Sequence, residues 1–454
     1  MNFSLPSFWI SLFLGLIVIA LLLALARGRK LDRWFLAGLS LTLLGLESGL
    51  TLGVFLLVFG VTYLALRSGV RSKVAVGGVL ILQLAPLVFY KYAPFMVGQV
   101  VSVPPDFLRD LLIPVGLSFY SFQMVGLVID TVKERKALPS FIDSLNFASF
   151  FPQIVAGPIE RRCDLLPQME SFRFKLDWNA IEYGVRWIVL GLFMKLILAE
   201  NIAAESAAVT IDAGNPFLIW LECLYFTFRV YHDFAGYSFI AYGLAHCLGI
   251  KLTLNFRSPY WTTNFRDFWR HWHVSLSQWF RDYLYIPLGG NRSPWRPALI
   301  FFVFAVSGVW HGAGWNFVLW GLLHGLLVLI PPWSSFRIPK ALAWGIQMAL
   351  IAITWLFFFE RDSGFLFEKL GTLFSPFQYP LTHLKEVMGA FPSKSAVIVS
   401  VAILGLSVLA LILEGLSLRR PYAFLTHRIS CLVLIVLIYL FKPAAYHEFI
   451  YFNF

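Results

Sequence analysis

Long apolar runs separated by short polar stretches dominate the chain. A helix needs about 20 mostly apolar residues to cross the hydrocarbon core of a membrane. Runs of this kind recur from one end of the sequence to the other, which indicates an all-α polytopic membrane protein. The predicted spans lie near residues 8–26, 74–90, 112–132, 180–199, 216–231, 234–250, 298–310, 315–330, 341–359, 395–414 and 429–442.

Residues 34–66 form a longer apolar block that is interrupted at Glu47. Basic residues flank the block on both sides, with Arg33 before it and Arg67 after it. Because basic residues concentrate on the cytoplasmic side of a membrane, a hairpin of two short spans fits these flanks better than one long helix. With this hairpin we expect about a dozen transmembrane helices.

Residues 141–160 resist this simple scheme. The segment is apolar but contains Pro152, Gly157 and Pro158, which break helices. Non-helical backbone at membrane depth is tolerated only where protein surrounds it. We therefore predict a re-entrant or interfacial segment here.

Composition and charge agree with a membrane protein. Of 454 residues, 59% are hydrophobic and 13% are charged, against about 25% charged in soluble domains. The net charge of +11 comes from short basic clusters between apolar runs, so it reflects membrane topology and indicates no nucleic-acid partner. The sequence contains no internal repeat typical of secondary transporters and no soluble domain.

Two basic regions predict the orientation of the chain. The first span is followed by a basic cluster at residues 27–33 and preceded by no basic residue. This pattern favours an uncleaved first helix with an extracytoplasmic N-terminus. The largest basic loop, residues 251–296, is expected on the cytoplasmic side.

A stretch within this loop predicts an amphipathic interfacial helix at residues 267–285. A helical wheel separates an aromatic face from a polar face, and Pro287 with Gly289 and Gly290 ends the helix. The predicted aromatic face carries Trp269, Trp272, Leu276, Trp279, Phe280 and Tyr283. The predicted polar face carries Arg270, His271, Ser275, Gln278, Arg281 and Asp282.

The wheel also separates two histidines. His273 falls at the edge of the aromatic face, where an ionisable group is costly and is either functional or a hydrogen-bonded core residue. His271 falls among the polar residues and is expected to be solvated. A metal site is a poor interpretation because the pair diverges and no carboxylate or cysteine cluster accompanies it. The four cysteines are scattered without CxxC spacing and predict neither a disulfide framework nor a metal site.

A second candidate site lies in residues 304–325, which contain no charged residue. His311 stands in the middle of this stretch, between Trp310 and Gly312. An imidazole at membrane depth is a functional hypothesis by default, although small residues here would also suit helix packing. His324 lies on the opposite face of a continuous helix and is expected to be structural.

A neutral histidine in a dry cavity suits general-base chemistry on a hydroxyl that attacks an acyl carbon. The sequence has no serine-nucleophile motif, P-loop or paired-carboxylate arrangement that would compete with this interpretation. The basic loop also suits an anionic donor such as a nucleotide thioester or phosphopantetheine.

These stretches resemble the membrane-bound O-acyltransferase superfamily, in particular its bacterial branch with the alginate O-acetyltransferases. The resemblance begins with "FWRHWHVSLSQWFRDYLYIPLGGNR" and "GVWHGAGWNFVLWGLLHG". It extends, in the same order as in that branch, to "LIPVGLSFYSFQMVGLVID", "FASFFPQIVAGPIERRCDLLPQM", "GLFMKLILAENIA" and the C-terminal "EFIYFNF".

The resemblance implies an enzyme that moves an acyl group, usually acetyl, onto a hydroxyl. It implies His311 as the essential histidine and His273 as the second histidine. It also implies a ring of tilted helices around a thin centre with a tunnel, in one domain over residues 1–454. That domain would comprise N-terminal helices (1–135), a catalytic core (136–330) and C-terminal helices (331–454).

The same resemblance places the chain in a bacterial inner membrane, with acetyl-CoA or an acyl carrier protein as donor and no bound cofactor. The acceptor would be a cell-envelope polysaccharide, and an extracytoplasmic acyltransferase-like or esterase-like protein would be a partner. Further residues are expected to line the site or bind substrate: Trp310, Asn316, Trp272, Trp269, Arg270, Asp267, Arg281, Asp282 and Tyr285.

Three departures from the branch keep alternatives open. His271 stands where arginine is usual, His232 stands where an aromatic residue is usual, and Phe239 replaces an aspartate that is frequent in alginate-type members. His232 is expected to be structural. The stretch "FAGYS" also resembles the branch that transfers D-alanine to teichoic acids, which is one alternative. A polysaccharide or lipid transporter is the other, although intramembrane charges are few.

Overall fold

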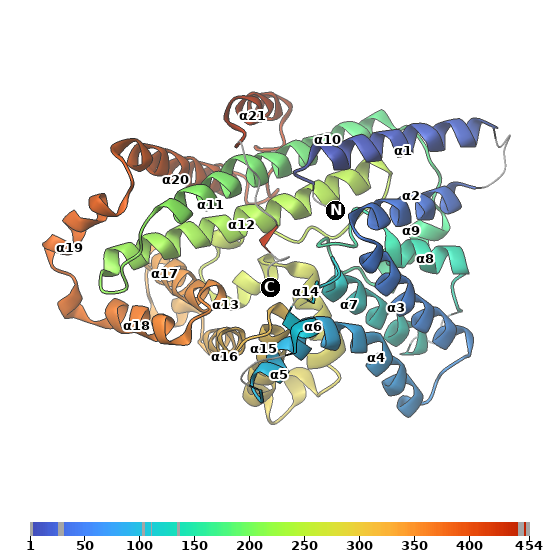
Figure 1. Cartoon of the computed structure of the whole chain (residues 1–454), viewed down its shortest axis with the longest axis horizontal. Coiled ribbons are helices and arrows are strands. Elements are labelled where there is room, and N and C mark those ends of the chain that lie inside the picture. The colour runs from blue at the N-terminus through green and yellow to red at the C-terminus, as the bar shows by residue number, and fades with distance from the viewer. Residues whose placement is uncertain are drawn as a thin grey trace. The chain divides into compact units, whose positions relative to one another are not determined.

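The computed structural model describes residues 3–25, 31–101, 105–109, 111–133, 137–443 and 449–450. Within these ranges the regular elements are helices and no strand occurs, so the predicted all-α class is confirmed (Figure 1). Residues 26–30, which hold most of the first basic cluster, and residues 448 and 451–454 of the C-terminal motif lie outside the described residues.

Two compact units make up the chain, and two of their boundaries fall inside the helices Trp178–Leu192 and Pro216–Cys247. Unit 1 consists of Met1–Ile188, Ser238–Leu254 and Arg281–Tyr283. Unit 2 consists of Val189–Tyr237, Asn255–Phe280 and Leu284–Phe454.

Several helices have the length and apolar composition of membrane spans, as expected for a multi-pass membrane protein. In the part of the chain that the structure describes, six helices qualify: Pro6–Leu25, Gly49–Arg67, Lys73–Gly98, Trp178–Ala208, Lys340–Phe359 and Lys394–Gly415. Three shorter apolar helices are Arg296–His311, Trp315–Leu329 and Arg428–Phe441.

Unit 1 contains the N-terminal helices, in which α3 packs against α4 and α7, and α2 packs against α8. Its helices are α1 (Pro6–Leu25), α2 (Asp32–Glu47), α3 (Gly49–Arg67), α4 (Lys73–Leu87), α5 (Ala93–Gly98), α6 (Asp106–Arg109), α7 (Leu117–Lys133), α8 (Phe141–Ser149), α9 (Arg162–Glu170) and most of α10 (Trp178–Leu192).

The predicted hairpin in residues 34–66 is confirmed, because α2 and α3 are separate helices joined at Ser48. Ser48 has extended backbone, with φ of −167°, and its hydroxyl accepts a hydrogen bond from the Thr51 N–H. A serine in this position satisfies one of the free N–H groups at a helix start. The break therefore follows Glu47, where the sequence predicted it.

The segment 141–160 is helical only as far as Ser149 and continues as turns through Gly157, as its prolines predicted. All residues from 142 to 160 are buried, so protein surrounds the non-helical backbone. Helix α2 holds the segment through an ion pair of 2.7 Å between Arg33 and Asp143. The Phe151 N–H also donates to the Ser40 hydroxyl at 3.2 Å.

The segment ends at a buried carboxyl group, Glu160, which accepts hydrogen bonds from the backbone N–H and the hydroxyl of Thr253. Burial raises the pKa of this carboxyl from 4.5 to about 7, although the two hydrogen bonds from Thr253 and the nearby Arg161 oppose that shift. In the folded chain Glu160 is therefore mainly the neutral acid at pH values below about 7.

Unit 2 contains the remaining helices, with α15 packed against α16 and α16 against α17. Its elements are the π-helical turn η2 (Phe193–Ala199), α11 (Glu200–Ala208), most of α12 (Pro216–Cys247), α13 (Phe265–His271), α14 (Val274–Phe280), α15 (Arg296–His311), α16 (Trp315–Leu329), α17 (Lys340–Phe359), α18 (Ser363–Phe374), α19 (Leu381–Glu386), α20 (Lys394–Gly415) and α21 (Arg428–Phe441).

The prediction of two spans at 216–231 and 234–250 is wrong, because residues Pro216–Cys247 form one helix of 32 residues. At 1.5 Å per residue this helix is about 48 Å long. His232 and Asp233 fall in the gap between the two predicted spans, but both side chains are buried within the helix. Lys195 forms an ion pair with Asp233, so a positive charge rather than water compensates the buried carboxylate.

Helices α15 and α16 form a hairpin whose backbones touch at two glycines. A Cβ atom on Gly308 would lie 2.2 Å from the Phe317 carbonyl oxygen, and one on Gly321 would lie 2.2 Å from that of Phe304. No side chain fits at either position, so the glycines fix how closely the two helices approach. Since His311 ends α15, this contact also fixes the position of the histidine.

We expect Gly321→Ala to lower the unfolding midpoint of the purified protein in detergent. The added methyl group would clash with backbone, and overpacking of this kind costs about 1–3 kcal/mol. Gly345→Ala is the matched control, because nothing lies within 4 Å of its Cβ position in α17 and alanine favours helix. Equal midpoints for the two variants would contradict the close contact.

We expect Glu160→Gln to flatten the pH dependence of thermal stability. The folded-state pKa of Glu160 lies near 7, above its usual 4.5. The contribution of Glu160 to the free energy of unfolding is therefore fully present below about pH 4.5 and is lost as the pH rises through 7. The loss is on the order of 3 kcal/mol. Glutamine keeps the acceptor for Thr253, and the exposed Glu170→Gln is the control. Unfolding midpoints from pH 5 to pH 8 measure the effect, and parallel curves for wild type and Glu160→Gln would refute it.

Candidate active site

The predicted continuous helix at residues 267–285 is wrong, because the chain forms two short helices with a break at Trp272 and His273. Helix α13 ends at His271, and Trp272 has extended backbone with φ of −102° and ψ of 126°. His273 has φ of 43°, a left-handed conformation that is uncommon outside glycine. Helix α14 then begins at Val274 and passes at Arg281 into a π-helical turn, which ends at Tyr285.

Backbone pairing with a neighbouring loop holds this break open. Asn255 accepts from the Val274 N–H at 3.0 Å through its carbonyl oxygen and from the Ser275 N–H at 3.1 Å through its side chain. The Arg257 N–H donates to the His271 carbonyl oxygen at 3.0 Å. These bonds replace helical ones, so the helical wheel does not apply across the break.

The break turns two consecutive side chains into the core. Trp272 is 1% exposed and His273 is 0% exposed. A continuous helix would point these neighbours in different directions. His273 was predicted at the edge of the aromatic face, and the break in the helix instead buries it completely. Ser275, which was predicted on the polar face, is buried as well.

His273 lies in an aromatic environment. Its ring centroid is 4.7 Å from that of Phe234, in an edge-on arrangement, and 6.1 Å from that of Trp310. Burial lowers the pKa of His273 to about 3. The imidazole is therefore neutral near pH 7, which is the form that can accept a proton.

His311 is the last residue of α15 and is 2% exposed. Its ring lies 4.9 Å from Trp310, 4.9 Å from Trp320 and 5.4 Å from Phe358, measured between centroids. Trp310 therefore borders both histidines. The structure brings the two predicted catalytic residues into one aromatic cluster of unit 2.

Trp272 and Trp269, which were predicted to line the site, extend this cluster. The Trp272 ring lies 5.3 Å from Trp355, and the Trp269 ring lies 5.8 Å from Trp320. His324 is fully buried in the same cluster, 4.7 Å from Trp320. A third imidazole thus lies one ring away from His311.

Asn316 ties the start of α16 to the end of α17. Its side-chain amide donates to the carbonyl oxygens of Phe357 at 3.0 Å and Glu360 at 3.2 Å. These carbonyls have no partner within α17 itself because they lie in its last turn or beyond it. Asn316 consequently fixes the turn that carries Phe358, which contacts His311.

Other predicted site residues pair at positions outside this cluster. Arg270 and Asp267 form an exposed ion pair of 2.9 Å. Tyr285 donates its hydroxyl to Asn291 at 2.9 Å.

Arg281 and Asp282 belong to unit 1, where Asp282 pairs with Arg281 at 2.7 Å and also with Arg161. A role in substrate binding for these two residues, and for Arg270, Asp267 and Tyr285, stays a prediction.

The sequence interpretation missed a buried charge cluster on η2, α11 and α12. The Lys195 ammonium lies 2.7 Å from Glu200 and 2.6 Å from Asp233. The second carboxylate oxygen of Asp233 accepts the Ile450 N–H at 2.7 Å. Charged residues inside apolar spans are rare and functional by default, so these three residues carried a signal that the sequence interpretation overlooked.

The C-terminal motif is described only at Phe449 and Ile450, and both are buried in unit 2. The Phe449 ring stacks on Tyr237 at 4.7 Å and lies 5.7 Å from Phe234. Since Phe234 also contacts His273, this part of the motif lies one ring away from the second histidine.

No group of three or more histidine, cysteine, aspartate or glutamate residues is arranged to hold a metal ion within the described ranges. The four cysteines are free thiols.

Comparison with known proteins identifies the family. Residues 99–360 match the family model described as MBOAT, membrane-bound O-acyltransferase family. The peptidoglycan O-acetyltransferase of Helicobacter pylori is 32% identical over 354 residues, which cover 69% of this chain and 67% of that protein. The probable alginate O-acetylase AlgI of Pseudomonas aeruginosa is 33% identical over 359 residues, which cover 73% of this chain and 68% of that protein.

A further relative has a different printed activity. The teichoic acid D-alanyltransferase of Bacillus subtilis is 31% identical over 298 residues, which cover 61% of this chain and 72% of that protein. Two of these relatives are named as transferases and the third as a probable O-acetylase, and the family match spans both candidate histidines. The chain belongs to the membrane-bound O-acyltransferase family.

Proposed function

We propose that this O-acyltransferase moves an acetyl group from a cytoplasmic thioester to a hydroxyl of a cell-envelope polysaccharide. The observation that carries the proposal is the aromatic cluster in which Trp310 borders both His273 and His311. Such an enclosure excludes water, so an activated acyl group would meet its acceptor rather than be hydrolysed.

In the proposed mechanism His311 is the general base. Its imidazole takes the proton of the acceptor hydroxyl as that oxygen bonds to the acyl carbon. The carbon–sulfur bond then breaks, and the imidazolium returns the proton to the departing thiolate. His273 orients or relays the proton. Its buried, neutral ring suits this role because it carries no charge that would oppose protonation of His311.

We further propose that the donor reaches the site from the side of the basic loop, residues 251–296. By the positive-inside rule this side is cytoplasmic, and the first helix then begins outside a bacterial inner membrane. The loop's excess of arginine and lysine suits the phosphates of acetyl-CoA or of the phosphopantetheine arm of an acyl carrier protein. We expect no tightly bound cofactor.

The acceptor is inferred from the relatives, which are named for peptidoglycan and alginate. An extracytoplasmic acyltransferase-like or esterase-like partner would complete transfer to such a polymer. The second candidate is D-alanyl transfer to teichoic acid, which the similarity to the Bacillus protein favours. Family membership favours either transferase over the transporter alternative.

Incubation of the purified protein with labelled acetyl-CoA, acetyl carrier protein and D-alanyl carrier protein separates these donors. We expect the acetyl thioester to be consumed in the presence of acceptor saccharide. Exclusive use of the D-alanyl donor would replace the proposal with the second candidate.

We expect His311→Ala to abolish acetylation of the envelope polymer while the protein reaches the membrane at its normal level. Removal of a general base alone costs about 10²–10⁴ in rate. The exposed His427→Asn is the control, because asparagine can still cap α21. Mass analysis of polysaccharide and peptidoglycan measures the effect, and wild-type acetylation in His311→Ala cells would refute the mechanism.

His273→Asn and His273→Ala separate the imidazole from the backbone at the helix break. Asparagine tolerates a positive φ better than alanine does, so we expect His273→Asn to be the more stable variant. Both should lose about 10²-fold or more in acyl transfer if the ring takes part in the chemistry. Unfolding midpoints and initial rates are compared in one detergent. Near-normal activity in a well-folded His273→Asn variant would show that the ring is only structural.

A further inference from the structure

Backbone strain collects around the helix break in unit 2. Besides His273, the residues Ser258, with φ of 52°, and Tyr422, with φ of 63°, have left-handed backbone. Among the described non-glycine residues only Arg337 shares this conformation. A left-handed residue with a side chain is costly and persists only where its surroundings hold it in place.

A directed chain of hydrogen bonds joins Ser258 and Tyr422 to helix α20. The Ser258 N–H donates to the Tyr422 hydroxyl at 2.9 Å. The Tyr422 and Tyr231 hydroxyls lie 3.0 Å apart, and Tyr231 donates to a carboxyl oxygen of Glu414 at 2.8 Å. A tyrosine hydroxyl has one hydrogen, so Tyr422 is the donor to Tyr231. All four residues are buried, and loss of one bond would leave an unpaired polar group in the interior.

This chain of hydrogen bonds supports the loop that holds the helix break. Ser258 directly follows Arg257, whose N–H donates to the last carbonyl oxygen of α13. The Tyr231 ring also lies 6.1 Å from that of Trp272, the residue before His273. The two tyrosines therefore contact the break from its loop side and from its aromatic side.

Helix α20 holds the same loop at a second point. The Trp261 indole N–H donates to the Leu411 carbonyl oxygen at 2.7 Å, about one turn before Glu414. A Cβ atom on Gly415 would lie 2.5 Å from the Trp261 ring, so helix and loop are in close contact. The end of α20 thus holds Trp261 directly and Ser258 through the two tyrosines.

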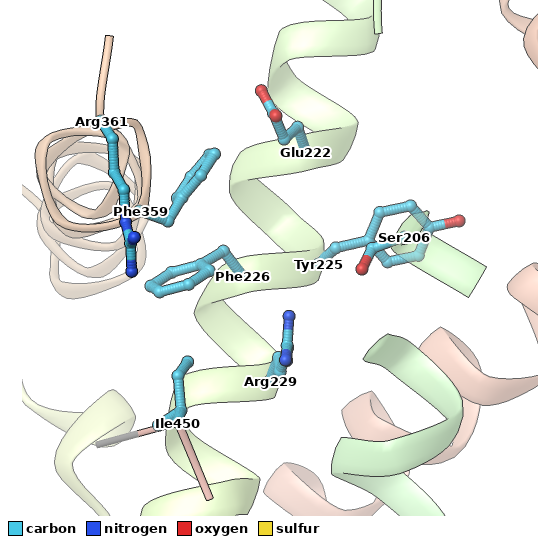
Figure 2. A pocket seen from close by; sticks show the side chains of 8 residues that line it. All are labelled: Ser206, Glu222, Tyr225, Phe226, Arg229, Phe359, Arg361 and Ile450. Carbon is cyan, nitrogen blue, oxygen red and sulfur yellow. The ribbon is translucent and has the colours of Figure 1, made fainter. Parts of the chain in front are cut away.

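The network is separate from a cavity of about 300 Å³ on the same helix, α12. Glu222, Phe226 and Arg229 are among the residues that line this cavity (Figure 2). None of the four residues in the hydrogen-bonded chain lines it. Tyr231 lies two residues after Arg229 and directs its hydroxyl to Glu414 instead. These contacts favour a role within the protein over ligand binding.

We propose that Tyr422, Tyr231 and Glu414 are positioning residues for His273. Their chain of hydrogen bonds fixes Ser258 in its left-handed conformation. The loop before Ser258 then stays paired with the helix break, and the imidazole stays in the core. The three residues act through the backbone rather than on substrate. This inference rests on the proposed function, in which His273 orients or relays the proton.

Tyr422→Phe tests the network because it removes one hydroxyl and keeps the ring. We expect kcat for acetyl transfer by the purified protein to fall about tenfold or more, because a buried N–H loses its acceptor. KM should change less than about twofold, since no substrate contact is removed. Hydrogen exchange of the amides in residues 271–275 should become about tenfold faster.

Tyr379→Phe is the matched control for this variant. The Tyr379 hydroxyl also donates to a backbone carbonyl, that of Leu373, at 2.9 Å, but it takes no part in the network. We expect kcat and the exchange of residues 271–275 to match wild type in this control.

Two variants of Glu414 test the end of the chain. Glu414→Leu removes the acceptor for the Tyr231 hydroxyl and should resemble Tyr422→Phe. Glu414→Gln keeps an amide oxygen as acceptor, so we expect its kcat to stay at least about fivefold above that of Glu414→Leu. Unfolding midpoints in the same detergent establish that each variant is folded at the assay temperature. Equal losses in the two folded variants would overturn the inference.

A double-mutant cycle tests whether the network acts through His273. If it does, Tyr422→Phe should lower kcat in wild type but change it less than about twofold in the His273→Asn background. A full additional loss in that background would overturn the inference. Unchanged hydrogen exchange of residues 271–275 in Tyr422→Phe would overturn it as well, whatever the activity of the variant.

Hydrogen exchange separates this inference from the proposed function, because it needs no acyl donor. Faster exchange in Tyr422→Phe together with normal acetyl transfer would refute the proposed role of His273 in the chemistry and support the network. Loss of transfer with unchanged exchange would do the reverse. If wild type transferred no acyl group from any thioester, the proposed function would fail, and the exchange measurement would still decide the inference.

Discussion

The break between α13 and α14 is the constraint on which the proposed active site depends. Asn255 and Arg257 take over the hydrogen bonds that a continuous helix would make across residues 271–275. Because unpaired backbone polar groups are costly in an apolar interior, the break exists only where such partners are supplied. It lets Trp272 and His273 enter the core together. Without it, the imidazole would lie at the edge of an interfacial helix.

A second constraint is the pairing of two buried lysines of unit 2 with carboxylates. Lys195 lies between Glu200 and Asp233, and Lys369 lies between Glu222 and Glu360. Breaking such a pair leaves an uncompensated charge in a medium that solvates it poorly. The first cluster holds Ile450 through Asp233, and the second joins Glu222 of α12 to Lys369 of α18.

A third constraint is the close packing around the two histidines in unit 2 of this acyltransferase. The α15–α16 hairpin is fixed by backbone contact at Gly308 and Gly321, so His311 has little freedom to move. Aromatic rings surround both imidazoles, and burial keeps the imidazole of His273 neutral by lowering its pKa.

The sequence by itself determined the helical class, the hairpin at Glu47, the broken segment 141–160 and the two histidines. Each follows from local composition: apolar length, helix breakers, or an imidazole within an apolar run. Only the tertiary structure decided the single helix across His232 and Asp233, because the partner of Asp233, Lys195, is 38 residues away in sequence. It also decided the helix break at His273. The break depends on hydrogen bonds with Asn255 and Arg257, which local periodicity does not record.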